Sequence, residues 1–260
     1  MANYYLDVQP ISRGKGHSVA RRASYICGQD LYDSYNEKFY RTPRDDVIFR
    51  SIFLPDGVPD QFRDLQFFCN EINRGEKRYD ARTAREFIGS LPSELPHQEL
   101  KWIAGEYIFK NFTRQGLCAI AAIHERHSVD NPAKNNPHLH IIVSTRTIGP
   151  DGFSKKKDRE HDRREYIAVW RESMADVQNR AYERNGLDIR VSHESLRAQG
   201  ILDREPTIRL SLADYNRELR GERTRAGDRK RAIQARNEER SRQRQLDRER
   251  SRDIERSHSR

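Results

Sequence analysis

The stretch from His138 to Arg146, HLHIIVSTR, sets two histidines in front of an apolar, β-branched run, and this composition predicts a strand. Pro137 and the asparagines before it mark the start of the strand. Because alternate residues of a strand share a face, His138 and His140 point to one side and the leucine between them points to the other. A second apolar stretch, Leu117 to His127, also predicts a strand, and this one ends in histidine. We therefore expect two strands that each carry histidine at one end.

The remaining patterns predict an α+β fold. Gly186 follows the last predicted helix of the body and is expected to end it. Since adjacent strands look hairpin-linked, we expect an antiparallel-rich central sheet with helices packed mainly on one face and the other face open. Strand patterns cover residues 2–8, 46–55 and 84–92, and helical patterns cover residues 18–27, 60–73, 96–112 and 164–184.

Composition changes sharply near residue 220, where a stretch almost entirely of Arg, Glu, Asp, Gln and Ser begins. We expect residues 1–219 to form the folded domain and residues 220–260 to form a charged basic tail, partly helical or disordered. The chain has a net charge of +9 and a pI near 9.6, which favours an acidic partner, with nucleic acid first. The tail is either an arm that contacts nucleic acid or a charged helix that touches nothing specific.

The cysteines and the N-terminus indicate the compartment. Cys27, Cys69 and Cys118 each lie in an apolar pattern without a C-x-x-C motif, which predicts reduced core residues. The first ten residues do not resemble a signal peptide, and no apolar run reaches membrane-spanning length. We therefore expect a cytoplasmic protein without membrane insertion.

The two histidines of H-x-H are spaced to bind one cation. Two ligands are rarely enough for a protein metal site, so a third ligand should come from elsewhere. If the two histidine-bearing strands pair antiparallel, His124 arrives beside His138 and His140. His127 is the alternative third ligand, but His124 continues the strand pattern. The competing interpretation is a strand edge with two solvated imidazoles.

A nucleophile for a phosphodiester substrate is suggested by the stretch SVARRASYICGQD, Ser18 to Asp30. Tyr25 lies near the end of the predicted helix, where Arg21 and Arg22 could neutralise phosphates. A tyrosine hydroxyl attacks only if a base or a metal helps to remove its proton. Water is the alternative nucleophile.

The helix of Tyr25 and the motifs REFIGSLPSEL, AIH and NPHLHIIVSTR, in this order, resemble the MobA/MobL family of conjugative relaxases, which are HUH endonucleases. The resemblance covers roughly residues 1 to 200. It implies a relaxase that nicks one DNA strand at a plasmid transfer origin, forms a 5′-phosphotyrosine link and later rejoins the ends. Its implied partners are single-stranded DNA at that origin and accessory mobilisation and secretion-coupling proteins.

The same resemblance implies roles for residues of this chain. Tyr25 is the implied nucleophile, and Glu86 is an implied supporting acid that orients a histidine through its second ring nitrogen. The implied cofactor is a divalent metal ion, Mn²⁺ or Mg²⁺ first and Zn²⁺ as an alternative, held by His124, His138 and His140.

Two basic stretches are candidates for gripping single-stranded DNA, and the first of them is equally compatible with an ordinary strand-to-helix loop. SRGKGHS offers cations just ahead of a helix N-terminus, and NRGEKRYDARTAR interleaves cations with a tyrosine, as single-strand grooves do. With those of the Tyr25 helix, the candidate DNA-binding residues are Arg13, Lys15, Arg21, Arg22, Arg74, Lys77, Arg78 and Arg82.

Two other functions fit the same residues. A metal-dependent hydrolytic nuclease would use water and leave no protein on the DNA. A noncatalytic nucleic-acid-binding protein with a structural zinc site would use the same histidines, because three imidazoles suit zinc as well as any ion. A covalent adduct with DNA separates both from a relaxase.

Overall fold

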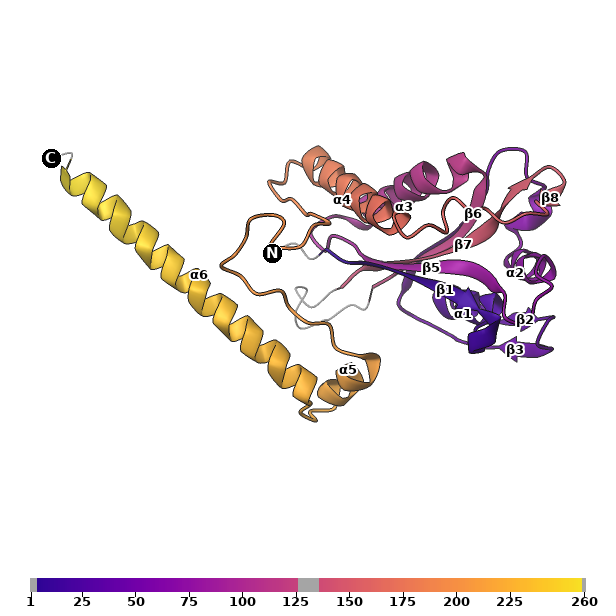
Figure 1. Ribbon diagram of the computed structural model, residues 1–260, viewed down its shortest axis with the longest axis horizontal. Helices are drawn as coiled ribbons and strands as arrows, with labels where there is room; N and C mark the ends of the chain where they lie inside the picture. Colours follow the sequence, from indigo (N-terminus) through magenta and orange to yellow (C-terminus); the bar gives the residue numbers. More distant parts are fainter. Residues whose placement is uncertain (1–3, 126–135, 259–260) are drawn as a thin grey trace. The chain divides into compact units, whose positions relative to one another are not determined.

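The computed structural model describes residues 4–125 and 136–258 of the chain (Figure 1). Two compact units are present, Met1–His193 and Glu194–Arg260. The first unit contains every predicted strand and every candidate site residue. The predicted boundary at residue 220 falls within the second unit.

The elements of the first unit alternate irregularly between strands and helices, as the sequence pattern predicts. The strands are β1 (Leu6–Ser12), β2 (Leu31–Asp33), β3 (Lys38–Tyr40), β4 (Val47–Phe53), β5 (Arg82–Ser90), β6 (Leu117–His124), β7 (His138–Gly149) and β8 (Gly152–Phe153). The helices are α1 (Val19–Cys27), α2 (Leu65–Arg74), α3 (His97–Asn111) and α4 (Tyr166–Arg184), with short 3₁₀ turns η1 (Arg13–Lys15), η2 (Asp60–Arg63) and η3 (Thr113–Gln115).

The main sheet has the strand order β1-β5-β7-β6-β4, and every pair in it is antiparallel. The strand β8 pairs with the far end of β7, and β2 and β3 form a separate hairpin. The predicted α+β class with an antiparallel sheet is therefore confirmed. The two histidine-bearing strands, β6 and β7, lie side by side within the sheet.

The first strand is displaced from its predicted position. The alternating pattern predicts residues 2–8, whereas β1 spans Leu6–Ser12 and includes Pro10. Proline cannot donate to a sheet, and it is tolerated in β1 because this strand lies at the edge of the sheet. The polar, proline-containing end of the strand therefore looked like a loop in the sequence.

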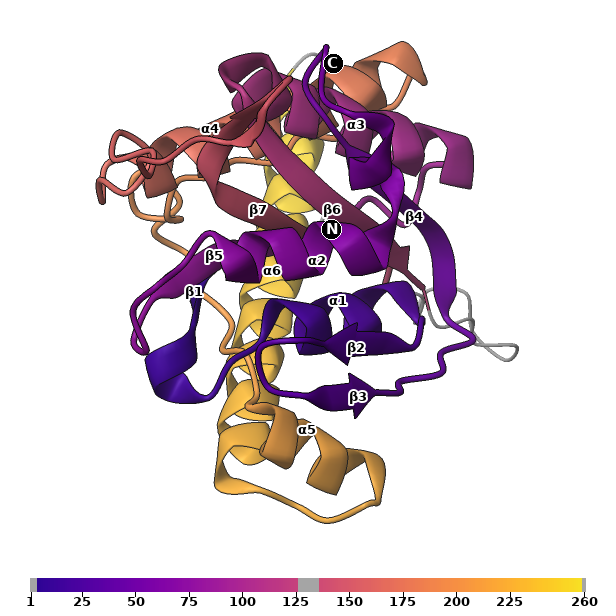
Figure 2. The ribbon, with the colours of Figure 1, turned by 90° about the vertical axis from the view of Figure 1, so that its right-hand side faces the viewer.

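Helices cover both faces of the sheet, which corrects the expectation that they pack mainly on one (Figures 1 and 2). The longer helices α3 and α4 pack on the face formed by residues such as Phe87, Ala121 and Ile141. The shorter helices α1 and α2 pack on the opposite face, against Ile120 and Ile142. The reason is visible in β6, where all eight residues are buried and both faces therefore need cover.

The second unit consists mainly of two helices, α5 (Leu212–Leu219) and α6 (Arg225–His258). The predicted charged tail is thus helical over 34 residues, about 50 Å at 1.5 Å per residue. Ion pairs within this unit, such as Arg231 with Glu218 and Arg236 with Glu205, connect α6 to the segment before it. In neither described range does any helix combine the length and the apolarity that a membrane span requires.

Candidate active site and metal centre

Three histidines meet where β6 and β7 pair. His124 lies directly opposite His138 in the register, and His140 lies two residues along β7 on the same face. One ring nitrogen from each histidine lies within 4.8 Å of those of the other two. The antiparallel pairing thus brings together the three predicted ligands, whereas the alternative ligand His127 lies outside the described residues.

We expected the histidines to lie on an open face of the sheet. In the structure, α1 covers this face. His124 is fully buried, His140 is 5% exposed and His138 is half-buried. Burial disfavours the imidazolium, lowering the pKa of His124 to about 4 and also lowering the pKa of His138. Both rings are therefore neutral near pH 7, the form in which histidine binds a metal ion.

In His124 and in His138, a hydrogen bond to one ring nitrogen leaves the other ring nitrogen for a ligand. His124 Nε2 donates to the carbonyl of Ile26 at 2.7 Å, which leaves its Nδ1 buried without a described hydrogen-bond partner. His138 Nδ1 donates to the carbonyl of Asn136 at 2.9 Å and leaves its Nε2 for a ligand. Neither nitrogen of the buried His140 has a hydrogen-bond partner among the described residues. Buried, unpartnered imidazole nitrogens that converge fit a divalent cation.

The helix α1 places Tyr25 beside this cluster. The ring centroid of Tyr25 lies 6.2 Å from that of His124 and 6.3 Å from that of His140. The tyrosine side chain is 38% exposed, so a substrate can reach it from solvent. Val19, Ala23 and Ile26 form the buried side of the helix, and Tyr25 lies outside this set of buried residues.

Both ends of α1 are fixed by specific contacts. Ser18 caps the N-terminus by accepting a hydrogen bond from the Arg21 amide at 3.1 Å. At the C-terminus Gly28 has a left-handed conformation, with φ of 62°, which ends the helix. The unpaired carbonyls of the last turn accept from the sheet: that of Ile26 from His124, and that of Cys27 from Arg50 at 2.7 Å. The same hydrogen bond therefore orients His124 and holds the helix that carries Tyr25.

Glu86 lies next to the cluster on β5, with its side chain buried. Its Oε1 is 3.8 Å from His140 Nδ1, longer than a hydrogen bond, so the attraction between them is electrostatic. The carboxylate instead accepts from the guanidinium of Arg22. Burial alone would raise the pKa of Glu86, but His140 and Arg22 outweigh it and the pKa is lowered. Arg22, a candidate phosphate contact, thus forms an ion pair inside the site.

The sequence pattern missed Arg44 and Asp46. The Arg44 guanidinium lies 4.4 Å from the ring centroid of Tyr25 and donates from Nε to Asp46 Oδ1 at 2.7 Å. This hydrogen bond lowers the pKa of Asp46, and the carboxylate lies close enough to His124 and His138 to interact with them electrostatically. Asp46 directly precedes β4, whose first residue pairs with His124. Only the pairing of β4 with β6 brings it to the site, and no spacing in the sequence reveals that pairing.

The remaining candidate DNA-binding residues are distributed differently. Arg13 donates to the carbonyls of Asn73 at 2.6 Å and Glu76 at 2.8 Å and therefore braces the turn after α2. Arg74 and Arg78 are exposed but paired with Glu71 and Asp80. The candidates that are exposed to solvent without a recorded acidic partner in the described part of the chain are Lys15, Arg21, Lys77 and Arg82.

Comparisons with known proteins agree with the predicted resemblance. The model of the MobA/MobL family matches residues 17–220. The chain is 34% identical over 163 residues to "Probable mobilization protein MobA" of Bifidobacterium longum (strain NCC 2705), covering 61% of this chain and 28% of that protein. It is 31% identical over 254 residues to "Mobilization protein MobL" of Acidithiobacillus ferridurans, covering 86% of this chain and 66% of that protein.

A solved structure described as "Molecular Basis of Vancomycin Resistance Transfer in Staphylococcus aureus" has a similar fold, with a TM-score of 0.67 and 24% identity. The match covers 75% of this chain and all of that one. The chain spans less than two thirds of the length of several relatives, 28% in the case of the B. longum protein. Since the family model covers most of its residues, the chain belongs to the MobA/MobL family.

Proposed function

We propose that this chain is a metal-dependent relaxase: it nicks one DNA strand at a plasmid transfer origin by transesterification onto Tyr25 and rejoins ends afterwards. The observation that carries the proposal is the position of Tyr25, whose ring contacts two of the three clustered histidines. Family membership supports it, because relatives are named as mobilization proteins. The basic net charge favours a polyanionic substrate.

The chemistry exchanges one phosphodiester for another. The oxygen of Tyr25 attacks the phosphorus and gives up its proton, the bond from phosphorus to the 3′ oxygen breaks, and that oxygen takes up a proton. The DNA is then linked to Tyr25 through its 5′ phosphate. Attack by a 3′ hydroxyl on this link reverses the step, so joining needs no nucleotide cofactor.

Residues around the tyrosine have separate tasks in this proposal. His124, His138 and His140 would hold a divalent ion, which would polarise a phosphate oxygen and offset the charge of the transition state. Arg44 lies over the Tyr25 ring and stabilises negative charge that develops on the attacking oxygen. Glu86 fixes Arg22 and interacts with His140, and thereby positions both.

Other tyrosines are placed less well for attack. Tyr4 packs with the hydrophobic cluster on the opposite face of the sheet and donates to the carbonyl of Arg171. Tyr166 belongs to the same cluster. Tyr32 packs against the Phe39 ring in the β2–β3 hairpin.

The test is incubation with single strands from a candidate transfer origin and Mn²⁺ or Mg²⁺, followed by a denaturing gel and peptide mapping. We expect a shifted protein band whose DNA-linked peptide contains Tyr25. Tyr25→Phe removes one oxygen and little volume, so cleavage and adduct should vanish together while metal and DNA binding survive. Tyr32→Phe is the matched control and should keep full activity.

Each alternative function has its own outcome in this experiment. Cut DNA without attached protein, also in Tyr25→Phe, would identify a hydrolytic nuclease. Bound but uncut DNA under all metal conditions would identify a noncatalytic binding protein. An adduct on another tyrosine would refute the assignment of the nucleophile.

A further inference from the structure

A pocket opens beside the N-terminal half of α1, between the turn η1, the β2–β3 hairpin and the turn that follows α2. It is distinct from the histidine cluster, since none of the three histidines lines it. Its lining combines cations with aromatic rings, chiefly Arg13, Arg21 and Lys38 with Tyr35, Tyr40 and Tyr79.

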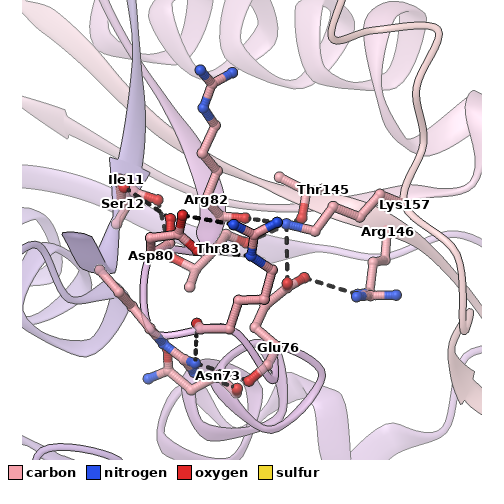
Figure 3. Close-up of polar contacts among 12 residues, drawn as sticks. Ile11, Ser12, Asn73, Glu76, Asp80, Arg82, Thr83, Thr145, Arg146 and Lys157 are labelled. Atoms are coloured by element: carbon pink, nitrogen blue, oxygen red, sulfur yellow. Dashed lines mark hydrogen bonds and ion pairs between the residues drawn. The ribbon is translucent and has the colours of Figure 1, made fainter. Parts of the chain in front are cut away.

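The turn of residues 75–81, which carries Tyr79 and forms one wall of the pocket, is held by buried ion pairs. Glu76 is almost fully buried and accepts from Arg146 Nε at 2.9 Å and Lys157 Nζ at 3.0 Å (Figure 3). Lys157 also donates to the Arg82 carbonyl at 2.5 Å. The turn of residues 75–81 is therefore tied to β7 through Arg146 and to the loop after β8 through Lys157. A pocket wall fixed in advance loses little conformational entropy when a ligand binds.

Arg13 joins this wall to the other side of the pocket. Its guanidinium donates to two carbonyls at the end of α2 and also lies 3.7 Å from the ring centroid of Tyr35. Tyr35 is consequently fixed beside the pocket, although half of its side chain is exposed. Tyr79 is 80% exposed, with its ring free to contact a ligand.

The two cations at the rim of the pocket, Arg21 and Lys38, differ from the neighbouring Arg78 in having no recorded acidic partner in the described part of the chain. Arg78, next to Tyr79, is paired with Asp80. Arg21 and Lys38 are exposed, and no acidic partner is recorded for either within residues 4–125 and 136–258. Their charge remains available to a ligand. Unpaired cations beside exposed aromatic rings fit a single nucleic-acid strand, which offers both phosphates and unstacked bases.

The pocket also lies in line with the nucleophile. Arg21 and Tyr25 are four residues apart on the exposed side of α1, which is one turn, or about 6 Å along the helix. Arg22, between them in sequence, points instead to Glu86. A strand whose phosphate lies at Tyr25 can therefore continue over Arg21 into the pocket.

We propose that this pocket binds a nucleotide of single-stranded DNA close to the phosphate that Tyr25 attacks. The base stacks on Tyr79 and Tyr35, and the flanking phosphates pair with Arg21 and Lys38. The identity of the ligand rests on the proposed function. The pocket adds a site that holds the strand in place independently of the metal.

Binding of fluorescein-labelled (dT)12 to the full chain tests this, measured by anisotropy in EDTA and in the Tyr25→Phe background so that nothing is cleaved. Tyr79→Ala should weaken binding by roughly fivefold or more, since stacking on an aromatic ring contributes about 1 kcal/mol or more per base. Its salt dependence should stay unchanged, because no charge is lost. Arg21→Ala should instead flatten the salt dependence, with a slope smaller by about 0.7.

Phe39→Ala is the matched control, because Phe39 is an exposed aromatic residue of the β2–β3 hairpin that does not line the pocket. It should bind (dT)12 like the parent chain. A parental affinity of Tyr79→Ala, or an equal loss in Phe39→Ala, would overturn the proposal. The binding assay needs no cleavage, so it is independent of the test for the adduct. If Tyr79→Ala weakens the binding of (dT)12 while the parent chain forms no adduct with DNA, the pocket proposal stands and the proposed strand transfer is refuted.

Discussion

His140 is buried, yet neither of its ring nitrogens has a hydrogen-bond partner in the described part of the chain. A buried polar group left without a partner costs about 1–3 kcal/mol, so folding alone gives no reason to keep it there. His124 is half-satisfied in the same way, with Nδ1 unpartnered. A cation bound between the rings would repay this cost. The cluster is therefore better explained by ligand binding than by packing.

His140→Ala should abolish strand cleavage, lowering the rate by more than about 100-fold, because even residues that only orient metal ligands contribute about 10–100-fold. His138→Ala should do the same. Neither variant should lose much stability, since His140 gives up no hydrogen bond among the described residues and the half-buried His138 gives up one, to the Asn136 carbonyl. The measurements are adduct formation, Mn²⁺ titration by calorimetry and thermal unfolding. His193→Ala, outside the cluster, is the control; full activity of either site variant with metal controlled by chelation would rule out the metal site.

Glu86→Ala should be milder than loss of a ligand. Its carboxylate fixes Arg22 and lies 3.8 Å from His140, so it acts on neighbouring side chains. We expect a loss of roughly 10-fold to 100-fold in adduct formation and weaker Mn²⁺ binding. Glu86→Gln should recover part of the activity, because the amide oxygen still accepts from Arg22. Equal activity of Glu86→Ala and the parent chain would show that the carboxylate has no part in the reaction.

Arg44→Ala should slow adduct formation at saturating DNA by about 10-fold or more, because a cation 4.4 Å from the Tyr25 ring centroid is lost where negative charge develops. Arg44→Lys should restore part of the rate. Arg41→Ala, an exposed arginine three residues earlier, is the control and should change neither rate nor affinity. A DNA affinity that falls as much as the rate would show that Arg44 binds the strand and leaves the chemical step alone.

The residues that could be predicted from the sequence are those whose spacing sets their geometry. Two histidines one residue apart on a strand must share a face, and His124 ends a second apolar strand. Arg44 lies before the predicted strand of residues 46–55 and Asp46 is the first residue of that strand, so no alternation indicates which face they take. Their place beside Tyr25 depends on a long-range strand pairing, and this kind of contact leaves no local pattern.

The helix α1 determines where the nucleophile stands, and its start was predictable because Ser18 precedes an apolar helical pattern. Its end depends on contacts that only the folded sheet provides, namely those of the Ile26 and Cys27 carbonyls with His124 and Arg50. Strand positions were predictable where both faces are apolar, as in β6. They were displaced in β1, where an edge strand tolerates Pro10.

Ser18→Ala should lower the free energy of unfolding by about 1–2 kcal/mol, because it removes the cap of α1 and a hydrogen bond to the buried Asp33. Amide exchange in α1 should rise, and adduct formation should slow as Tyr25 becomes less fixed. Denaturant unfolding and hydrogen exchange measure these effects. Ser18→Thr keeps the cap and should stay close to the parent chain, and Ser211→Ala, which removes the cap of α5, should leave α1 unchanged. Unaltered exchange in α1 of Ser18→Ala would contradict this account.

The division of the chain into two units predicts how charge and catalysis separate. Residues 1–193 contain the sheet, the histidines and Tyr25, whereas residues 194–260 hold nineteen basic and thirteen acidic residues. Most of the net charge of +9 therefore lies outside the unit that carries the candidate site. Over residues 225–251 the helix α6 is strongly polar, with the buried Ile233 as an exception, so this part of the helix has no continuous apolar face.

Chains that end at residue 193 or at residue 219 should fold, bind Mn²⁺ and form the adduct, because the sheet and both hydrophobic clusters lie before residue 194. Their nonspecific affinity for DNA should fall. The plot of log K against log salt should also flatten, by about 0.7 for each phosphate of a single strand that the shortened chain no longer neutralises. Thermal unfolding and anisotropy at several salt concentrations measure both effects. An unchanged slope would show that the basic helix does not touch DNA, and failure to fold of the chain ending at 219 would show that the catalytic unit extends further than residue 219.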